Sequence, residues 1–220
     1  MACHPTRCRD ELQFATSLGA LLRINALPRL GKRRRAPDTL TMPLPRSWPR
    51  VYVAGPDVFR ADATVHLQRL ARTCEAHELR GVLPVDDQAH EDVNLTGHAL
   101  AQHIFRTNMK SLRSAHGVIA NLAPFRGTEP DAGTVFEVGA AVMLGLPVVA
   151  YGVPPGTYLN RVRGMLAAKP DPVGVLRDPD GLAVEDFGLA MNLMLACSVE
   201  LAVSAEEAVQ RVARLIAQGR

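Results

Sequence analysis

Aromatic residues, cysteines and long apolar runs are all scarce in this 220-residue sequence. Aromatic residues make up 5% of it, which disfavours a single-stranded nucleic-acid binder, because such proteins stack bases on aromatic side chains. No apolar run reaches the ~18 residues that a membrane-spanning helix needs. Four cysteines are too few and too scattered for a disulfide framework, and they indicate reduced thiols in a cytoplasmic protein: Cys3, Cys8, Cys74 and Cys197.

The signatures of several common active sites are missing as well. No GxGxxG motif follows the first glycine-containing strand end, no phosphate-binding P-loop motif occurs, and no GxSxG elbow surrounds a serine. Cys3, His4 and Cys8 have no second ligand pair at zinc-finger spacing, and His98 and His103 lie five residues apart, which splays them on a helix. The sequence therefore predicts no metal site.

The net excess of positive charge comes from the first fifty residues. Residues 1–50 hold ten Lys or Arg and three acidic residues, which leaves fifteen and nineteen of the totals of 25 and 22 for residues 51–220. The body of the chain is mildly acidic, which disfavours a basic nucleic-acid groove across it. Hydrophobic residues make up 47% of the sequence, enough for a sizeable core.

The basic segment has the composition of a solvated linker. The run Lys32-Arg33-Arg34-Arg35 is followed by prolines at 37, 43, 45 and 49. We predict a basic, proline-rich, disordered leader over residues 1–48 and one folded domain over residues 49–220. Two other interpretations stay open: a tether for nucleic acid or a membrane surface, and translated upstream sequence before a start at Met42.

Strands and helices alternate along the body. Short apolar runs predict strands at 51–54, 82–83, 117–122 and 147–151, and helical spacing predicts helices from about 62, over 97–114 and 134–144, and near the C-terminus. This alternation indicates a doubly wound α/β fold in three layers, with a parallel sheet covered by helices on both faces. Ligands of such folds bind beyond the carboxyl ends of the strands, which selects the loops 55–60, 122–133 and the stretch after Tyr151.

One of these loops leads into a helix that carries two acidic residues. Asp131 ends the loop and Glu137 follows about one turn into the predicted helix, so we expect both to face the strand-end crevice. A helix N-terminus favours an anion by ~0.3–1 kcal/mol, which we expect to keep Glu137 ionised at neutral pH. An ionised carboxylate can attack the anomeric carbon of a sugar. From spacing alone, a solvated glutamate or a charge that complements the helix dipole is the favoured interpretation, because acidic residues near helix starts are common.

Three segments carry a resemblance to a known family. They are VYVAGPDVF at 51–59, ANLAPFRGTEPDAGTVFEVGAAVMLGLPVVAY at 120–151 and NLML at 192–195. With the pattern between them, the chain resembles the nucleoside 2-deoxyribosyltransferase family over roughly residues 50–200. The resemblance implies a flavodoxin-like (Rossmann-like) catalytic domain that transfers 2-deoxyribose between nucleobases. It implies retention of configuration through a covalent deoxyribosyl-glutamate, with no metal and no organic cofactor.

The resemblance also implies roles for individual residues. Glu137 matches the family's nucleophile, Tyr52 a tyrosine that orients this carboxylate, and Asp131 an acid on the 5′-hydroxyl side of the sugar. In the first loop we place Gly55, Asp57 and Phe59 among the substrate-binding residues, with Phe59 as an apolar wall for the base.

Asn108 departs from the family pattern, because many members have an aspartate that protonates or hydrogen-bonds the leaving base. An amide can hold a base edge but cannot supply a proton. Asn192 and Met194 match residues that reach into a neighbouring subunit's pocket, which implies a homo-oligomer, commonly a hexamer. The expected partners are a deoxynucleoside and a free nucleobase, with no nucleic acid and no membrane.

Two other functions stay open. One is an N-glycosidase that hydrolyses 2′-deoxynucleosides or their 5′-monophosphates. An ionised Asp131 disfavours the monophosphate, because like charges ~4 Å apart repel by ~4 kcal/mol at an effective dielectric of 20. The other is a non-catalytic nucleoside sensor on the same fold.

Overall fold

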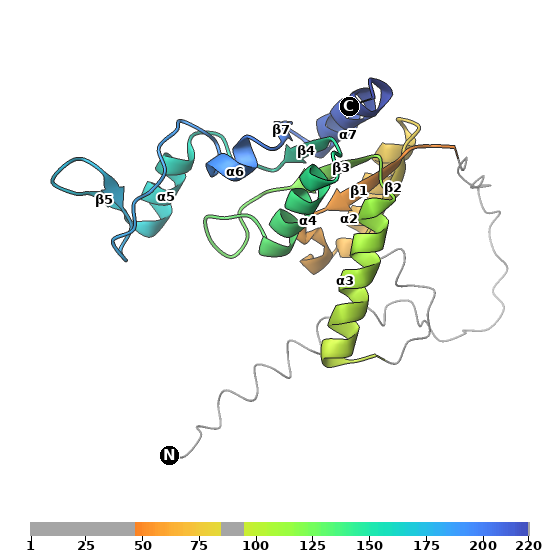
Figure 1. The fold of residues 1–220 in the computed structure, drawn as a ribbon, viewed down its shortest axis with the longest axis horizontal. Coiled ribbons are helices and arrows are strands. Elements are labelled where there is room, and N and C mark those ends of the chain that lie inside the picture. Colours follow the sequence, from red (N-terminus) through yellow and green to blue (C-terminus); the bar gives the residue numbers. More distant parts are fainter. Residues whose placement is uncertain (1–46, 85–94, 220) are drawn as a thin grey trace, which may run out of the picture. The chain divides into compact units, whose positions relative to one another are not determined.

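The computed structural model describes residues 47–84 and 95–219 (Figure 1). Most of the predicted leader, residues 1–46, lies outside this range, so the boundary at residue 48 stays a prediction. The contacts divide the chain into two units, and the division falls within one helix: described residues 95–107 belong to the first, and residues 47–84 with 108–219 belong to the second. The sheet and the candidate site are both in the second unit.

Five parallel strands form the central sheet, in the order β2-β1-β3-β4-β7. They are β1 (Arg50–Ala54), β2 (Arg80–Val82), β3 (Gly117–Asn121), β4 (Val148–Tyr151) and β7 (Glu200–Leu201). The inner strands β1, β3 and β4 are short runs of mostly Val, Ile and Ala that are buried on both faces, as parallel strands covered on both sides must be. The predicted parallel α/β fold is confirmed.

Helices cover both faces of this sheet, so the fold has three layers. The helices α2 (Ala63–Glu75) and α7 (Ala205–Ala217) pack on the face that carries Val51, Val53 and Ile119. On the other face, α4 (Ala132–Met143) and the end of α3 (Gly97–Arg113) pack over Tyr52, Ala54 and the alternate residues of β3. Because successive side chains of a strand point to opposite faces, Tyr52 lies on the α4 side.

The loops after β1 and β3 meet at the topological switch point of the sheet. From β1 the chain crosses to β2 on one side, and it later returns to place β3 on the other side. In doubly wound sheets the crevice for ligands opens at such a point, beyond the carboxyl ends of the strands. The loop after β1 contains the 3₁₀ helix η1 (Pro56–Phe59), and the loop after β3 leads into α4.

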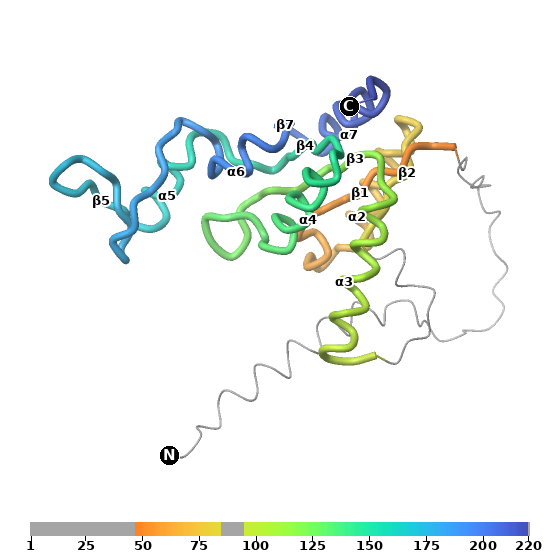
Figure 2. The backbone as a smooth tube through the Cα atoms, viewed as in Figure 1, coloured from red at the N-terminus to blue at the C-terminus, as the bar shows by residue number. Residues whose placement is uncertain are grey.

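The connection between β4 and β7 contains elements that the sequence analysis did not predict. They are α5 (Tyr158–Leu166), β5 (Lys169–Pro170), β6 (Leu176–Arg177) and α6 (Leu193–Ala196), and Figure 2 follows the excursion of the chain through them. The β5–β6 hairpin is held by a side chain, since Asp171 accepts hydrogen bonds from the backbone of Val173 and Val175 and from Arg177. Elements this short have too few residues to show a period in the sequence.

Most element boundaries differ from the predicted ones by one or two residues, as β2 and α4 illustrate. Strand β2 spans Arg80–Val82, whereas the predicted strand was the apolar pair at 82–83. Helix α4 begins at Ala132 because the Asp131 side chain accepts a hydrogen bond from the Thr134 backbone amide. Within the described residues, no helix combines the length and the apolar character that crossing a bilayer requires.

Two glycines offer a matched test of helix–sheet packing. A Cβ atom on Gly117 in β3 would lie 2.7 Å from Val212 Cγ2 on α7, whereas a Cβ on Gly139 in α4 would meet nothing within 4 Å. We expect Gly117→Ala to lower the free energy of unfolding by about 1–3 kcal/mol, because α7 must move away from the sheet. Gly139→Ala should instead raise it by up to about 1 kcal/mol, since alanine favours a helix interior. Denaturant titration of both variants measures the difference, and equal effects would contradict this packing.

Candidate active site

A tyrosine and a glutamate form the centre of the site. Tyr52 is fully buried in β1, and its hydroxyl donates a hydrogen bond of 2.6 Å to Glu137 Oε1. Glu137 lies on α4, which packs over β1 and β3 on the face where the strand alternation places Tyr52. The two residues are 85 positions apart in the sequence, so only the packing of α4 on the sheet brings them together.

Asn108 approaches the same carboxylate oxygen from α3. Its Nδ2 lies 3.4 Å from Glu137 Oε1, a long hydrogen bond beside the short one from Tyr52. Both donors therefore converge on one oxygen, and within the described residues the other oxygen, Oε2, accepts no hydrogen bond from the protein. This arrangement fixes the carboxylate by Oε1 and leaves Oε2 for other chemistry.

Asp131 begins α4 and acts on Glu137 through its charge. Its Oδ2 accepts hydrogen bonds from the Thr134 backbone amide at 2.9 Å and from the Thr134 hydroxyl at 3.0 Å. The Asp131 charge contributes to raising the pKa of Glu137. The structure thus brings together Tyr52, Asn108, Asp131 and Glu137 from β1, α3 and the start of α4.

Burial controls the protonation of the central carboxylate. The pKa of Glu137 is raised to about 7, chiefly by burial; Asp131 raises it further, while the hydrogen bonds from Tyr52 and Asn108 lower it. The helix N-terminus was expected to keep Glu137 ionised at neutral pH, but its gain of ~0.3–1 kcal/mol is smaller than the cost of desolvation, so the carboxylate is only partly ionised there. Burial and the neighbouring Glu137 also raise the pKa of Tyr52 well above its ordinary value, so the phenol stays a hydrogen-bond donor.

Of the predicted residues in the first loop, Asp57 is buried and contacts polar side chains, whereas Phe59 lies further out. Asp57 is 5% exposed, accepts a hydrogen bond of 2.9 Å from Asn121 Nδ2, and lies 3.2 Å from His66 Nε2. A Cβ atom on Gly55 would lie 2.9 Å from the Asn121 Cβ, so this position needs glycine for close packing. Contacts of Gly55 and Asp57 with substrate stay predictions.

Phe59 stands at the outer end of the same loop. It is 44% exposed, and its ring stacks on Phe125 with the centroids 5.5 Å apart. The Arg126 guanidinium lies over Phe125 at 4.5 Å and over Phe59 at 5.6 Å. The loop 122–133 was predicted to bind ligand, but Asn121, Phe125 and Arg126 were not predicted as site residues. The available signal was the place of Asn121 at the end of β3 and of the other two in the loop that follows.

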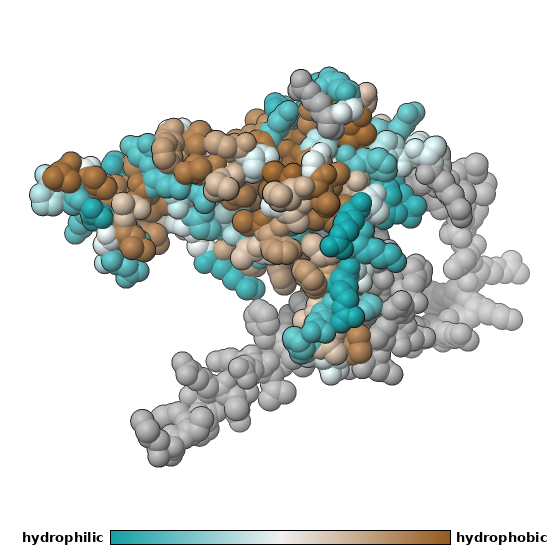
Figure 3. Space-filling view, in the orientation of Figure 1, coloured by the Kyte–Doolittle hydropathy of each residue, from teal (hydrophilic) through white to brown (hydrophobic). Residues whose placement is uncertain are grey.

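Asn192 and Met194 lie on α6 and make no hydrogen bond to the Glu137 carboxylate in the described chain. Asn192 Oδ1 accepts a hydrogen bond of 3.1 Å from the Leu195 backbone amide, and Met194 is 72% exposed. Figure 3 shows hydrophobic surface over the region of α4 and α6, where the exposed apolar side chains include Phe136, Met143 and Met194. Their predicted contribution to a neighbouring subunit's pocket stays a prediction.

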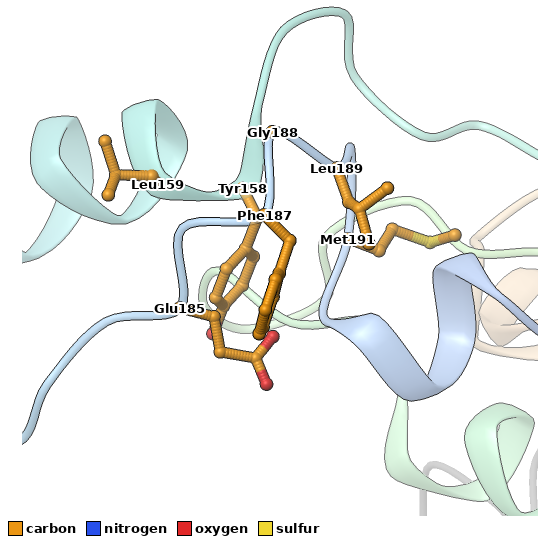
Figure 4. Close-up of a pocket in the computed structure, with 7 residues that line it drawn as sticks. All are labelled: Tyr158, Leu159, Glu185, Phe187, Gly188, Leu189 and Met191. Carbon is orange, nitrogen blue, oxygen red and sulfur yellow. The ribbon is translucent and has the colours of Figure 1, made fainter.

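A shallow pocket lies elsewhere on the molecule, between α5 and the segment before α6. Figure 4 shows its lining, which includes Tyr158, Glu185 and Phe187 and none of the four residues around the Glu137 carboxylate. It is a surface depression with no enclosed space for even a water molecule, whereas most small-molecule sites enclose ~300–1,000 Å³. We therefore place the site at the Tyr52–Glu137 pair, on chemistry rather than on the depth of the hollow. Among the described residues, no group of three His, Cys, Asp or Glu side chains is placed to hold a metal ion.

A half-buried carboxylate held by a tyrosine near the strand ends of a doubly wound α/β fold is a candidate active site of an enzyme. The family model of nucleoside 2-deoxyribosyltransferase matches residues 51–194, and the chain belongs to this family. Membership of this family makes the protein an enzyme of the deoxyribosyltransferase type.

Two relatives illustrate the likeness. The solved structure of a 2-desoxiribosyltransferase from Leishmania mexicana is 29% identical, with a TM-score of 0.60, over 76% of this chain and 97% of that one. Uncharacterized protein C191.05c of Schizosaccharomyces pombe is 30% identical over 161 residues, which cover 68% of this chain and 76% of the relative.

The raised pKa of Glu137 predicts a pH-dependent stability. Between the ordinary value of 4.5 and about 7, the folded state holds a proton that the unfolded state has released, so stability falls as pH rises through this window. Glu137→Gln keeps an acceptor for Tyr52 and removes the buried charge. We expect its stability relative to the wild type to be greater at pH 8 than at pH 5, by on the order of 2 kcal/mol.

Thermal unfolding at the two pH values checks this, with the same change at the exposed Glu206 as the control. A stability difference that does not vary with pH would contradict the raised pKa.

Proposed function

We propose that this protein transfers 2-deoxyribose from a deoxynucleoside to a free nucleobase through a covalent deoxyribosyl-glutamate at Glu137. The observation that carries the proposal is the 2.6 Å hydrogen bond from Tyr52 to Glu137 Oε1, with Oε2 left without a protein donor. This geometry holds a nucleophilic carboxylate in a single orientation. Family membership supports the same assignment.

In the first step, Oε2 of the ionised Glu137 attacks C1′ of the sugar. The C1′–O bond forms as the C1′–N bond breaks, and the bonding electron pair leaves with the base. The departing base needs a proton, and the Asn108 amide has none to give. We assign this proton to water, because the ionised Asp131 that raises the pKa of Glu137 has none to give, and we assign Asn108 to holding the carboxylate and the base edge. In the second step a nitrogen of the acceptor base attacks C1′ from the face opposite Glu137 and loses its proton to water. The C1′–O bond breaks, its electron pair returns to the Glu137 carboxylate, and two displacements together retain the configuration.

We propose a homo-oligomer with a shared site as the working form. Asn192 caps the short helix α6, on which the side chain of Met194 is exposed. Apolar side chains of helix α4 are exposed as well, including Met143 at 85%. Contiguous exposed apolar surface of this kind marks protein contacts. In such an assembly α6 would supply Asn192 and Met194 to the pocket of a neighbouring copy, as the family resemblance implies.

Hydrolysis is the second candidate function, and one observation bears on its substrate. Asp131 stands at the start of α4, where a 5′-phosphate would meet its carboxylate. We therefore expect a free 5′-hydroxyl on the donor. If water replaces the acceptor base in the second step, the same covalent intermediate gives free deoxyribose.

Base exchange tests the proposal directly. A deoxynucleoside is incubated with a panel of free bases, and new nucleosides are identified by chromatography. We expect Glu137→Ala to lower exchange by at least ~10³-fold with the oligomer intact, because the nucleophile is lost. Glu206→Ala, at an exposed position on α7, is the matched control and should exchange normally.

Three outcomes would redirect the proposal. Exchange by Glu137→Ala near the wild-type rate would overturn the covalent mechanism. Equal product formation with and without an acceptor base would make the protein mainly a hydrolase, and faster base release from monophosphates would overturn the expected free 5′-hydroxyl.

The acid limb of the pH profile should report Glu137. Because the nucleophile must be ionised, kcat/KM for base release should rise with pH and level off above about 7. Asn108→Asp places a second carboxyl group where the amide lies 3.4 Å from Glu137 Oε1. This like charge should move the acid limb upward by roughly one pH unit. Initial rates from pH 5 to pH 9 measure the acid limb of the wild type and of Asn108→Asp. An acid limb at the same pH in both proteins would contradict Glu137 as the group that titrates.

A further inference from the structure

Asn121 joins the loops that follow three neighbouring strands. It is the last residue of β3, and its Nδ2 donates to Asp57 Oδ2, in the loop after β1, at 2.9 Å. Its Oδ1 accepts from the Ala123 backbone amide, in its own loop, at 3.1 Å. A Cβ atom on Gly152, directly after β4, would lie 2.5 Å from the same Oδ1. The amide is therefore enclosed on each side by backbone or by a buried partner.

Asp57 has a second side-chain neighbour besides Asn121. It lies within η1, and its second oxygen, Oδ1, faces His66 Nε2 of α2 at 3.2 Å. A buried carboxylate of this kind is stable only where donors surround it. The Asn121–Asp57 hydrogen bond thus fixes η1 against the end of β3, at the switch point of the sheet.

A second link joins the same two loops further out. Phe59, two residues after Asp57, stacks on Phe125, and Arg126 covers both rings. Arg126 adopts a positive φ of 56°, which non-glycine residues rarely adopt, and the turn is closed by a hydrogen bond of 2.9 Å from the Phe125 amide to the Glu129 carbonyl. The position of the Phe59 ring therefore depends on both loops at once.

We infer that Asn121 and Asp57 are positioning residues that set the place of the Phe59–Phe125 wall, so that this pair governs selection of the nucleobase rather than cleavage at Glu137. The inference rests on the proposed function and on the predicted role of Phe59 as an apolar wall for the base. Asp57 is two residues from Phe59, and Asn121 is four residues from Phe125. A change in the length of the Asn121–Asp57 hydrogen bond therefore moves both rings. The Glu137 carboxylate is held separately, by Tyr52 and Asn108.

A swap of the two side chains tests the inference. Asn121→Asp keeps an acceptor for the Ala123 amide and sets two carboxylates against each other in place of the hydrogen bond. Asp57→Asn in the same chain restores one donor and one acceptor with the roles exchanged. Asn160→Asp, at an exposed position on α5, is the matched control for the added charge.

Three quantities are measured: the rate of base release in a single turnover without acceptor, KM and kcat for purine and pyrimidine acceptors, and the melting temperature. We expect Asn121→Asp to raise KM for the preferred acceptor by about tenfold and to reduce the purine–pyrimidine preference, with a smaller effect on single-turnover release. The double variant should recover most of the preference. Asp57→Asn alone, which leaves a neutral acceptor for Asn121, should show a weaker change in the same direction.

The inference is overturned if Asn121→Asp slows single-turnover release as much as it impairs acceptor use, or if the double variant regains its melting temperature without its base preference. If Asn121→Asp does not fold, the single Asp57→Asn variant decides: an unchanged base preference overturns the inference. Failure of the proposed function is distinguishable, since exchange by Glu137→Ala would overturn it whatever the Asn121 variants do.

Discussion

The short hydrogen bond between the Tyr52 hydroxyl and Glu137 Oε1 is the interaction on which the site depends. Burial of the carboxylate opposes its ionised form and raises its pKa to about 7, and the Tyr52 phenol is the strongest donor that compensates. The same bond turns the carboxylate so that Oε2 has no protein donor. A weakly solvated, oriented carboxylate is a better nucleophile than a fully hydrated one, at the cost of being only partly ionised near neutral pH.

The helix that carries Glu137 is positioned by the residue that also acts on its charge. Asp131 caps α4 through two hydrogen bonds to Thr134, and its carboxylate raises the pKa of Glu137 from the start of the same helix. One side chain therefore contributes to both the start of the helix and the electrostatics of the site. Substitution of Asp131 would alter both, which makes its effect on rate harder to assign to a single role than that of Asn108.

The topology of the sheet explains why the loops after β1 and β3 carry so much of the polar and aromatic structure. These strands flank the switch point, where helices leave the sheet in opposite directions and a crevice opens. Asn121, Asp57 and Phe125 bridge that crevice in the folded chain. Sequence reasoning reached the loops through the strand-end rule, but it had no means to pair Asn121 with Asp57, which are 64 positions apart.

The sequence by itself determined the parallel α/β fold, the approximate places of four of its strands and the candidate residues Tyr52, Asp131 and Glu137, because periodicity, short β-branched runs and family motifs are local properties of the chain. Only the tertiary structure decided which oxygen of Glu137 accepts both hydrogen bonds, how far burial raises its pKa, and that Asp57 faces Asn121 and His66. Desolvation depends on every atom packed around a group, and cross-strand contacts depend on the order of the strands. Neither quantity can be read from a linear pattern of residues.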